Sequence, residues 1–434
     1  SMRSGTGRSG IVCRTTARSA CGCACHRVRA PSFFRLTLPL AGLNFVNQAS
    51  RTLIATVGPL LAVEFALSAS ELGLLAAMFF AAYGAAQLPV GLAIDLWGAR
   101  RVQTVLALVA AAGFAVCAAA DGAVMLAVGR VITGLGISAG LIAMLKVNTQ
   151  WHPPDRVAGL AGLGVFVGSL GSIAATLPAA LLVPWLGWRG VFLLLGALAV
   201  AVSLWIWLSV PDRGPGAAAP KRTLGREVAE FGRIFAHPTF QRFAPSVALL
   251  SALNFTYQGL WAGPWLRDVG RLDDTTRAAT LMAYALGLMV GSVGMGQAAS
   301  WLQRRGAHPM TVPWVAMATV AAVQVVLILH PFAHPAALGA VWFLFALSSA
   351  AGPAGYAAIG QRFGAELAGR VATAINFAML AVVFVLQNAI GWILDLWPRA
   401  AGGGWHPAGY GWALGMTLAL QALALLPMLR AERR

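Results

Sequence analysis

Long apolar stretches fill most of the chain, and their lengths predict helices that cross a membrane. A bilayer core about 30 Å thick needs about 20 helical residues for each crossing. Only helices or closed barrels satisfy every backbone polar group in lipid, and these stretches are too long and too evenly apolar for barrel strands. We therefore predict an all-α membrane protein with twelve transmembrane helices. The expected spans are at about 36–65, 71–94, 102–120, 123–146, 158–183, 191–210, 243–266, 278–301, 312–330, 335–360, 371–393 and 409–429.

The first stretch differs from the others, because polar residues occupy one face of its middle. They are Asn44, Asn47, Gln48 and Arg51. Their spacing of i, i+3, i+4 and i+7 places them on one side of a helix. A charge near the middle of a bilayer is costly, so Arg51 should face a protein interior or a watery cavity and meet a negative partner. Few acidic residues lie within the predicted spans, so we expect that partner to be the substrate.

The seventh span repeats this polar face, which indicates two related halves. Its polar residues, at the same spacing, are Asn254, Tyr257, Gln258 and Trp261. A second, weaker echo links residues 91–101 with residues 296–306. Chance could explain either echo alone, but the two together favour two pseudo-symmetric six-helix bundles. Such bundles around a site at the middle of the membrane are common among secondary transporters.

A polar, basic segment that begins with Gly and Pro residues separates the two halves. An apolar stripe within it predicts an amphipathic helix on the inner membrane surface. The stripe consists of Leu224, Val228, Phe231 and Phe235. The expected organisation is a disordered basic tail at 1–35, an N-terminal six-helix bundle at 36–210, a cytoplasmic linker at 211–242 and a C-terminal six-helix bundle at 243–430.

The charges agree with a membrane protein and set its expected orientation. Charged residues make up 10% of the chain, whereas a soluble domain carries about 25%. The net charge of +17 does not indicate nucleic acid, because most Lys and Arg residues fall in the tails and in the loops on one side. By the positive-inside rule we expect a multi-pass protein of the cytoplasmic (inner) membrane with both termini in the cytoplasm. We expect it to work as a monomer in the lipid bilayer.

We expect no metal, no cofactor and no catalytic site. Four of the five cysteines lie in the basic tail beside His26, where they could bind a soft metal, but a reduced tail without one is the simpler expectation. They are Cys13, Cys21, Cys23 and Cys25. Residues 136–140 fit the nucleophile pattern Gly-x-Ser-x-Gly around Ser138, yet no His lies near the middle of the membrane, so helix packing explains the match. The sequence has no phosphate-binding loop of the Gly-x-x-x-x-Gly-Lys-Ser/Thr type, so an ion gradient should supply the energy.

The segment between the second and third spans carries the most specific motif. Its matching residues are Gly91, Asp95, Gly98, Arg100 and Arg101. They resemble the loop Gly-x-Leu-Ala-Asp-Arg-x-Gly-Arg-Arg of the major facilitator superfamily, although Leu96 stands where that family has Arg. Arg130, Gly134 and Gly136 resemble the Arg-x-x-x-Gly-x-Gly of its fourth helix. The resemblance covers nearly everything after the tail and implies the twelve-helix fold of that family.

The resemblance implies that this loop is a gate. In the family it keeps the outward-facing state closed on the cytoplasmic side. We therefore expect the five matching residues to act in gating. Asp95 should face the positive N-terminal end of the eleventh helix, near Arg370 and Val371.

The first two spans resemble the anion:cation symporter branch, whose members move organic anions, sugar acids or phosphate. That branch usually has Asp-Arg in its first helix, and here Ser50 stands before Arg51 in place of the Asp. The other matching residues are Asn47, Pro59, Glu64, Gly73, Tyr83, Gln87 and Pro89. Ser169 occupies a position that is Pro in drug antiporters, which counts against that branch.

Together these features predict a secondary transporter that takes up a small organic anion by alternating access, coupled to protons. The proton carrier would be Glu64 or the substrate. The expected substrate-binding residues, around the first, fourth, seventh and tenth spans, are Arg51, Asn47, Gln48, Arg130, Asn254, Tyr257, Gln258, Trp261 and Asn376. Arg130 has an alternative role as a structural hydrogen-bonding residue, and Lys146 could simply extend to the membrane interface. Two other functions stay open: a proton-driven exporter of a metabolite or drug, and a sensor or scaffold that transports nothing.

Overall fold

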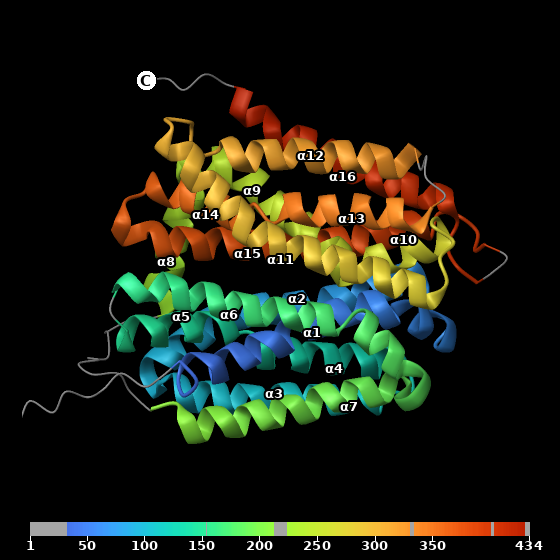
Figure 1. The fold of residues 1–434 in the computed structure, drawn as a ribbon, viewed down its shortest axis with the longest axis horizontal. Coiled ribbons are helices and arrows are strands. Elements are labelled where there is room, and N and C mark those ends of the chain that lie inside the picture. The colour runs from blue at the N-terminus through green and yellow to red at the C-terminus, as the bar shows by residue number, and fades with distance from the viewer. Residues whose placement is uncertain (1–32, 153, 212–223, 330–333, 401–402, 430–434) are drawn as a thin grey trace, which may run out of the picture. The chain divides into compact units, whose positions relative to one another are not determined.

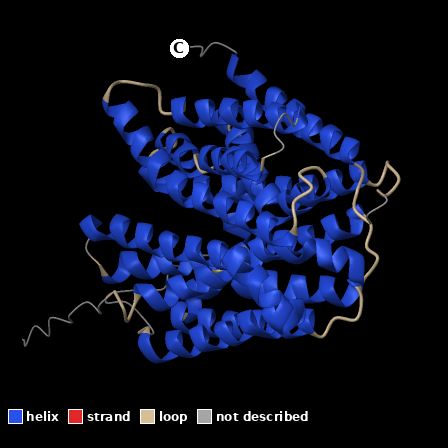
Figure 2. Cartoon of the chain, turned by 45° about the vertical axis from the view of Figure 1, so that its right-hand side comes forward, coloured by secondary structure: helices blue, strands red, loops and turns tan. Residues whose placement is uncertain are grey.

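The computed structural model describes residues 33–152, 154–211, 224–329, 334–400 and 403–429. Their regular structure consists of sixteen α-helices and one π-helical segment (Figure 1, Figure 2). The cysteine run and all but the last three residues of the tail expected at 1–35 lie outside the described residues.

Helices account for nearly all of the described chain. The first half forms α1 (Thr37–Glu64), α2 (Ala69–Trp97), α3 (Ala99–Ala118), α4 (Ala123–Ile137), α5 (Gly140–Trp151), α6 (Pro154–Ala174) and α7 (Leu177–Ser209). Between the halves lies α8 (Leu224–Ala236). The second half forms α9 (Pro238–Thr256), η1 (Tyr257–Trp261), α10 (Ala262–Asp268), α11 (Asp274–Arg304), α12 (Thr311–Leu329), α13 (Pro335–Ser349), α14 (Gly352–Gln361), α15 (Ala365–Leu394) and α16 (Pro407–Leu429).

The helices group into the twelve predicted crossings. In the described chain, eight are long and apolar enough to cross a membrane alone, with α13 and α14 counted as one, and α4 and α6 are shorter apolar helices. The other two crossings are α1, which has 28 residues and carries the polar face, and the run from α9 through η1 to α10. The all-α prediction is confirmed.

Three predicted spans are interrupted where the hydropathy gives no sign of a break. The fourth is divided between α4 and α5 at Ser138 and Ala139, and the tenth between α13 and α14 at Ala350 and Ala351. The seventh changes from α to π geometry at η1. The residues at these breaks are as small or apolar as their neighbours, so the apolar run continues through them.

The turn between the fifth and sixth spans lies inside α7. Gly187 has a φ of 67°, a left-handed conformation that favours glycine, and it separates two helical segments within α7. Residues 177–186 continue the fifth span, and the sixth span begins after Gly187, close to the expected residue 191.

The two halves pack against each other along three seams. α2 packs along α15, α1 packs against η1 and α10, and α6 and α7 pack against α11. In Figure 1 the helices of the first half are blue to green and those of the second half yellow to red. The backbones approach closely at Gly263, where an added Cβ would lie 1.9 Å from the carbonyl O of Ala55. The chain therefore needs glycine at this position.

The pair α2 and α15 is antiparallel. Near the beginning of α2, a Cβ on Gly73 would meet the carbonyl O of Gln387 at 2.4 Å. Further along, Nδ2 of Asn376 donates to Oε1 of Gln87 at 3.0 Å. Residue numbers thus rise along α2 while they fall along α15. The C-terminal end of each helix lies towards the N-terminal end of the other.

At one end of the bundle, which we call the Asp395 end, hydrogen bonds join the two halves. The carboxylate of Asp395, just after α15, accepts hydrogen bonds from the backbone N–H groups of Ala69 (2.9 Å) and Ser70 (2.8 Å), at the beginning of α2. Arg399 donates to the carbonyl O of Leu67. These contacts hold the end of α15 against the beginning of α2.

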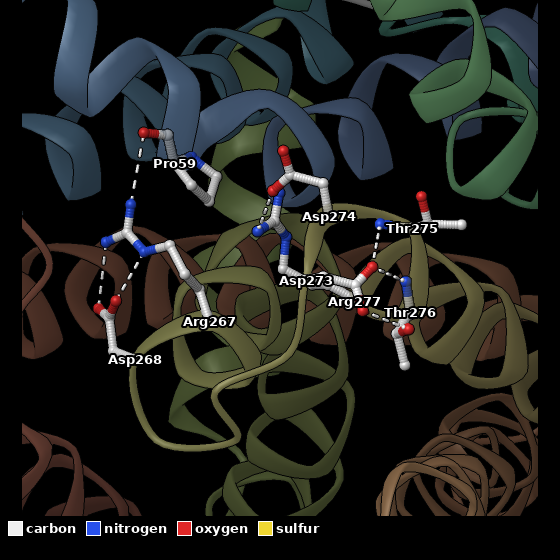
Figure 3. Close-up of polar contacts among 8 residues, drawn as sticks. All are labelled: Pro59, Arg267, Asp268, Asp273, Asp274, Thr275, Thr276 and Arg277. Carbon is white, nitrogen blue, oxygen red and sulfur yellow. Dashed lines mark hydrogen bonds and ion pairs between the residues drawn. The ribbon is translucent and has the colours of Figure 1, made fainter. Parts of the chain in front are cut away.

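Arg267 adds a further link between the halves at this end. Its Nη1 donates to the carbonyl O of Pro59 in α1 at 3.4 Å, while its Nε pairs with Asp268 at 2.6 Å (Figure 3). Asp268 also accepts a hydrogen bond from the hydroxyl of Tyr410 at 2.7 Å. The guanidinium is therefore held by its own half while it reaches the other.

At the opposite end, which we call the Asp95 end, one ion pair lies within the first half and another joins the second half to the linker. Asp95 pairs with Lys146, which joins α2 to α5. Arg370 in α15 pairs with Glu230 of α8 at 2.6 Å. The helices α5 and α14 pack mainly against helices of their own half. We infer that the two halves are closed together at the Asp395 end.

The linker helix α8 packs against protein. Phe231 and Ile234 are 9% and 4% exposed, and α8 contacts α9 and α15. We had expected the apolar stripe that includes Phe231 to face lipid. The side chains of Leu224 and Val228, in the same stripe, lie outside the described part of the chain.

Candidate functional site

Arg51 lies in the middle of α1 and is enclosed by aromatic rings. Its side chain is 6% exposed. Its Cζ lies 4.6 Å from the ring centroid of Tyr83, 4.9 Å from that of Phe255 and 5.8 Å from that of Phe80. Tyr83 and Phe80 belong to α2, and Phe255 belongs to α9 in the other half. Arg51 therefore sits at the seam between the halves, as its position on the polar face predicted.

The charge of Arg51 has no carboxylate beside it among the described residues. Its Nε has no hydrogen-bond partner there. A buried polar atom without a partner is rare in native proteins and calls for an explanation, such as a ligand or an ordered water. The aromatic faces attract the cation but cannot neutralise its charge. The surroundings of Arg51 therefore suit a negatively charged ligand.

Arg130 of α4 is buried, with 1% of its surface exposed, and it makes structural hydrogen bonds. Its Nη1 donates to the carbonyl O of Ser50 at 3.1 Å and to its Oγ at 3.2 Å. Its guanidinium also lies over Phe79, with Cζ 4.3 Å from the ring centroid. These bonds join α4 to α1, which is the alternative role that the sequence left open for Arg130. Ligand binding by Arg130 stays a prediction.

The other polar residues of α1 differ in whether their side chains have hydrogen-bond partners. Nδ2 of Asn44 donates to the carbonyl O of Gly164 at 3.4 Å, so it connects α1 to α6. Asn47 is 2% exposed, and its Oδ1 has no hydrogen-bond partner in the described chain. Gln48 is half-buried. Asn47 lies one helical turn before Arg51, so the two unpartnered groups share one face of α1.

In the second half, Asn254 and Tyr257 bind residues of their own bundle. Oδ1 of Asn254 accepts hydrogen bonds from the hydroxyl groups of Tyr284 (3.0 Å) and Ser349 (3.2 Å). The hydroxyl of Tyr257 shares a hydrogen bond of 3.3 Å with Oγ1 of Thr417. Both side chains therefore help to hold the second bundle together.

Gln258 and Asn376 reach the first half instead. Nε2 of Gln258 donates to Oγ of Ser172 in α6 at 3.3 Å. Asn376 pairs with Gln87 in α2, as described above. The side chain of Trp261 is 1% exposed, and its Nε1 has no hydrogen-bond partner in the described chain. The Trp261 ring lies close to α2, because a Cβ added at Gly73 would be 3.2 Å from it. Its Nε1–H is therefore a further buried donor near α2.

The π geometry of η1 alters the face that we expected these residues to share. The positions i, i+3, i+4 and i+7 share one side of an α-helix. In a π-helix the hydrogen bonds run from i to i+5, so each turn holds more residues and the sides shift. Within this segment Tyr257 contacts its own half and Gln258 contacts the other. Segments of this kind are frequent at functional sites.

The predicted gating residues surround the turn between α2 and α3. Gly98 has a φ of 86°, which favours glycine at this turn. Arg100 lies over Trp207, with Cζ 4.3 Å from the ring centroid. Asp95 pairs with Lys146, and Arg101 is exposed. A Cβ at the remaining residue, Gly91, would meet no atom within 4 Å.

The contact that we expected between Asp95 and the beginning of α15 stays a prediction. Arg370, near that point, pairs with Glu230 of α8. The Asp95–Lys146 pair itself was not foreseen, because the sequence offered no spacing signal that joins the second and fourth spans.

The sequence reasoning also missed Asp395, although the chain contained a signal for it. The segment from Gly391 to Trp397 repeats the pattern of the segment from Gly91 to Trp97, with an Asp-Leu-Trp triplet four residues after each glycine. The first copy ends α2 and the second copy ends α15. The same short motif therefore closes both helices of the antiparallel pair.

No group of three or more His, Cys, Asp or Glu residues that could hold a metal ion occurs within the described ranges. The cysteines for which the sequence left a metal open, from Cys13 to Cys25, lie outside those ranges.

Known proteins that resemble this chain are transporters. Residues 40–387 match the sequence model of the Major Facilitator Superfamily. The probable sulfoacetate transporter SauU of Cupriavidus necator is 28% identical over 270 residues, which cover 58% of this chain and 60% of that protein. The gallate transporter of Pseudomonas putida is 29% identical over 285 residues, which cover 57% and 61%. The chain thus matches about three fifths of the length of these relatives.

Solved structures show the same fold. A bacterial homologue of the human lysosomal transporter Spinster, in an inward-facing and occupied conformation, has a TM-score of 0.70 with this chain at 19% identity. The superposition covers 89% of this chain and 94% of that one.

Proposed function

Because the chain belongs to the Major Facilitator Superfamily, we propose that it carries a small organic anion across the membrane by alternating access, with Arg51 as the residue that binds the anion. The family makes the protein a membrane transporter and not an enzyme. The observation that carries the proposal is the burial of Arg51 among aromatic rings without a carboxylate beside it in the described chain.

The energetics of a buried charge support an anionic ligand. Removing one partner from a buried ion pair costs about 3–5 kcal/mol, because an uncompensated charge remains. An aromatic ring beside a desolvated cation stabilises it by about 2 kcal/mol, which offsets only part of that cost. A carboxylate or sulfonate that reaches Arg51 would add charge-assisted hydrogen bonds, the strongest kind available to a guanidinium.

Two further buried groups support a ligand that also has a polar body. Oδ1 of Asn47 is an acceptor and Nε1 of Trp261 is a donor, and neither has a partner in the described chain. A ligand that carries a hydroxyl group could satisfy both kinds of group. The names of the two relatives agree with an anionic ligand, since sulfoacetate and gallate are both organic anions.

We propose that the Asp95 end faces the cytoplasm, because the positive-inside rule places the Lys- and Arg-rich loops there. With the Asp395 end closed, the structure then corresponds to an inward-facing form. Gradient-driven uptake is the direction that we propose. Both termini would lie in the cytoplasm.

A thermal-shift screen of the purified protein against small anions, together with neutral and cationic compounds of similar size, tests the proposal. A ligand present at 100 times its dissociation constant stabilises the folded protein by about 2.7 kcal/mol, which is easily measured. We expect at least one carboxylate or sulfonate to stabilise the wild type and not Arg51→Ala. Arg305→Ala is the matched control, since Arg305 also lies over an aromatic ring, that of Trp301, but is exposed. A hit list that contains only neutral or cationic compounds would contradict the proposal and favour an exporter of drugs or metabolites.

A further inference from the structure

The acidic residues of this chain avoid the middle of every span. The sequence contains 14 Asp and Glu residues. They are Glu64, Glu71, Asp95, Asp121, Asp155, Asp212, Glu227, Glu230, Asp268, Asp273, Asp274, Glu366, Asp395 and Glu432. Those within the described chain lie in the first or last turn of a membrane-spanning helix, in the linker helix α8 or in a connecting segment.

Two cations occupy the middle instead. Arg51 and Arg130 lie 6% and 1% exposed, in α1 and α4. Arg130 donates to Ser50 and lies over Phe79, so its contacts, like those of Arg51, are with neutral groups. The other ionisable side chains on helices that pack around these two arginines include Tyr83 of α2, Tyr257 of η1 and Cys117 of α3, and none of them is a carboxylate.

Glu64, the proton carrier suggested by the sequence, is engaged elsewhere. It is the last residue of α1, and its side chain is 39% exposed. Its carboxylate pairs with Arg189 at 2.7 Å and accepts a hydrogen bond from Nε1 of Trp188 at 2.5 Å. Those partners favour the charged form. Glu64 is therefore poorly placed to bind and release a proton together with a ligand at Arg51.

The two buried arginines limit how the transporter, once it has released its ligand, can change back to its other form. During alternating access both ends close around the site, and water is removed from it. A protein carboxylate beside the arginines would neutralise them in that state and could exchange a proton with each side. This chain has no such residue at the middle of its spans, so an anion is the available neutralising group.

We propose that this transporter is an anion exchanger, which changes between its inward- and outward-facing forms efficiently only with an anion bound. Uptake of one anion is then tied to release of another, and a proton gradient alone does not drive net accumulation. This inference rests on the proposed function, because it takes Arg51 as the site of the anion. It replaces the proton-coupled uptake that the family resemblance implied.

The experiment uses the full-length protein in proteoliposomes with radiolabelled sulfoacetate as the probe. One set of vesicles holds unlabelled sulfoacetate, and the other holds an impermeant neutral osmolyte. Because unpaired buried charges raise the barrier for return of the empty carrier, we expect initial uptake at least about tenfold faster into the sulfoacetate-loaded vesicles. An inward proton gradient should leave that ratio nearly unchanged.

Two outcomes would overturn different parts of the argument. Net uptake into sulfoacetate-free vesicles that matches the loaded ones, or that a proton gradient drives, overturns exchange but leaves anion transport intact. Equal and background-level uptake into both sets overturns the proposed anion site together with exchange. Arg51→Ala defines that background.

Ser50 offers a gain-of-function test of the same inference. Its Oγ lies 3.2 Å from Nη1 of Arg130, so Ser50→Asp places a titratable carboxylate beside a central cation. We expect this variant to accumulate sulfoacetate in sulfoacetate-free vesicles when a proton gradient is imposed. Ser50→Asn, which is nearly the same size but neutral, should remain an exchanger. The same gain in Ser50→Asn would overturn the role that we assign to the missing carboxylate.

Discussion

Asp395 binds the backbone of Ser70, since its Oδ2 accepts a hydrogen bond of 2.8 Å from the N–H group of a residue 325 positions away. The N–H of Ala69 donates to the other carboxylate oxygen. The first turn of a helix carries exposed N–H groups and the positive end of the helix dipole, so a carboxylate there is stabilising. An acid from the second half thus caps a helix of the first half.

We expect Asp395→Asn to loosen the closed Asp395 end. A carboxylate at a helix N-terminus is worth about 1 kcal/mol, so the ratio of closed to open forms at this end should fall roughly fivefold. Cysteine-accessibility labelling from the Asp395 side measures that ratio. Asp121→Asn is the control, because Asp121 is an exposed acid in the turn before α4. Equal labelling of the two variants would remove Asp395 from the gate.

The Asp95 end gives a prediction that separates gating from local stability. Asp95 pairs with Lys146 here, whereas we expect it to contact the beginning of α15 in the opposite form. We expect Asp95→Asn to favour the form seen here, which is closed at the Asp395 end, because the alternative form loses a charge–dipole contact. Lys146→Ala removes the pair but leaves that carboxylate, so it should not shift the balance in the same direction. If both variants change accessibility alike, the ion pair and not the gate explains the effect.

We predict that Arg51→Ala lowers the affinity for the best anion by about two orders of magnitude or more, as expected when one member of a buried charge pair is lost. Arg51→Lys should restore only part of the affinity, because an ammonium cannot form the two parallel bonds of a guanidinium. Isothermal titration calorimetry of the three proteins measures this series. Unchanged affinity in Arg51→Ala would place the anion elsewhere.

Gly263→Ala should destabilise the seam between α1 and α10. The new Cβ would lie 1.9 Å from the carbonyl O of Ala55, so backbone on one side must move. Overpacking of this kind typically costs about 1–3 kcal/mol, which a lower Tm in detergent would report. Gly415→Ala in α16 is the matched control, since a Cβ there meets no atom within 4 Å. An equal effect of both substitutions would mean that helix propensity and not the close approach determines the result.

Reporter tags test the proposed orientation. A tag at the C-terminus and one between residues 211 and 222 should both report the cytoplasm, and one at Gly403, before α16, should report the outside. Each result follows from an even number of crossings and the positive-inside rule. A cytoplasmic report from Gly403 would contradict the arrangement of the last two crossings.

The crossings could be predicted from the sequence because lipid requires long apolar helices, and hydropathy records that requirement directly. The breaks could not be predicted. Ser138 and Ala139 end α4 without lowering the apolar character of the span, and η1 consists of residues that an α-helix also accepts. Local backbone geometry, unlike burial in lipid, leaves little trace in composition.

The central site, like the crossings, could be predicted only in part. The isolation of Arg51 could be predicted, since a scarcity of acids is a property of the sequence. Its aromatic neighbours could not, because Phe255 approaches only when the two halves pack together. Asn254 and Tyr257 form hydrogen bonds within the second bundle, and their role in ligand binding stays a prediction. Their spacing alone could not reveal a change in helix type.

The antiparallel pair of α2 and α15 also constrains how this protein can evolve. The two helices have nearly equal lengths, 29 and 30 residues. α2 ends in an Asp-Leu-Trp triplet, and the same triplet directly follows α15. One inserted residue would displace such a triplet by about 1.5 Å along the helix and turn it by about 100°. Asp395 would then no longer align with the N–H groups of Ala69 and Ser70. An insertion or deletion in one of these two helices should therefore be tolerated only when the other helix changes in length by the same number of residues.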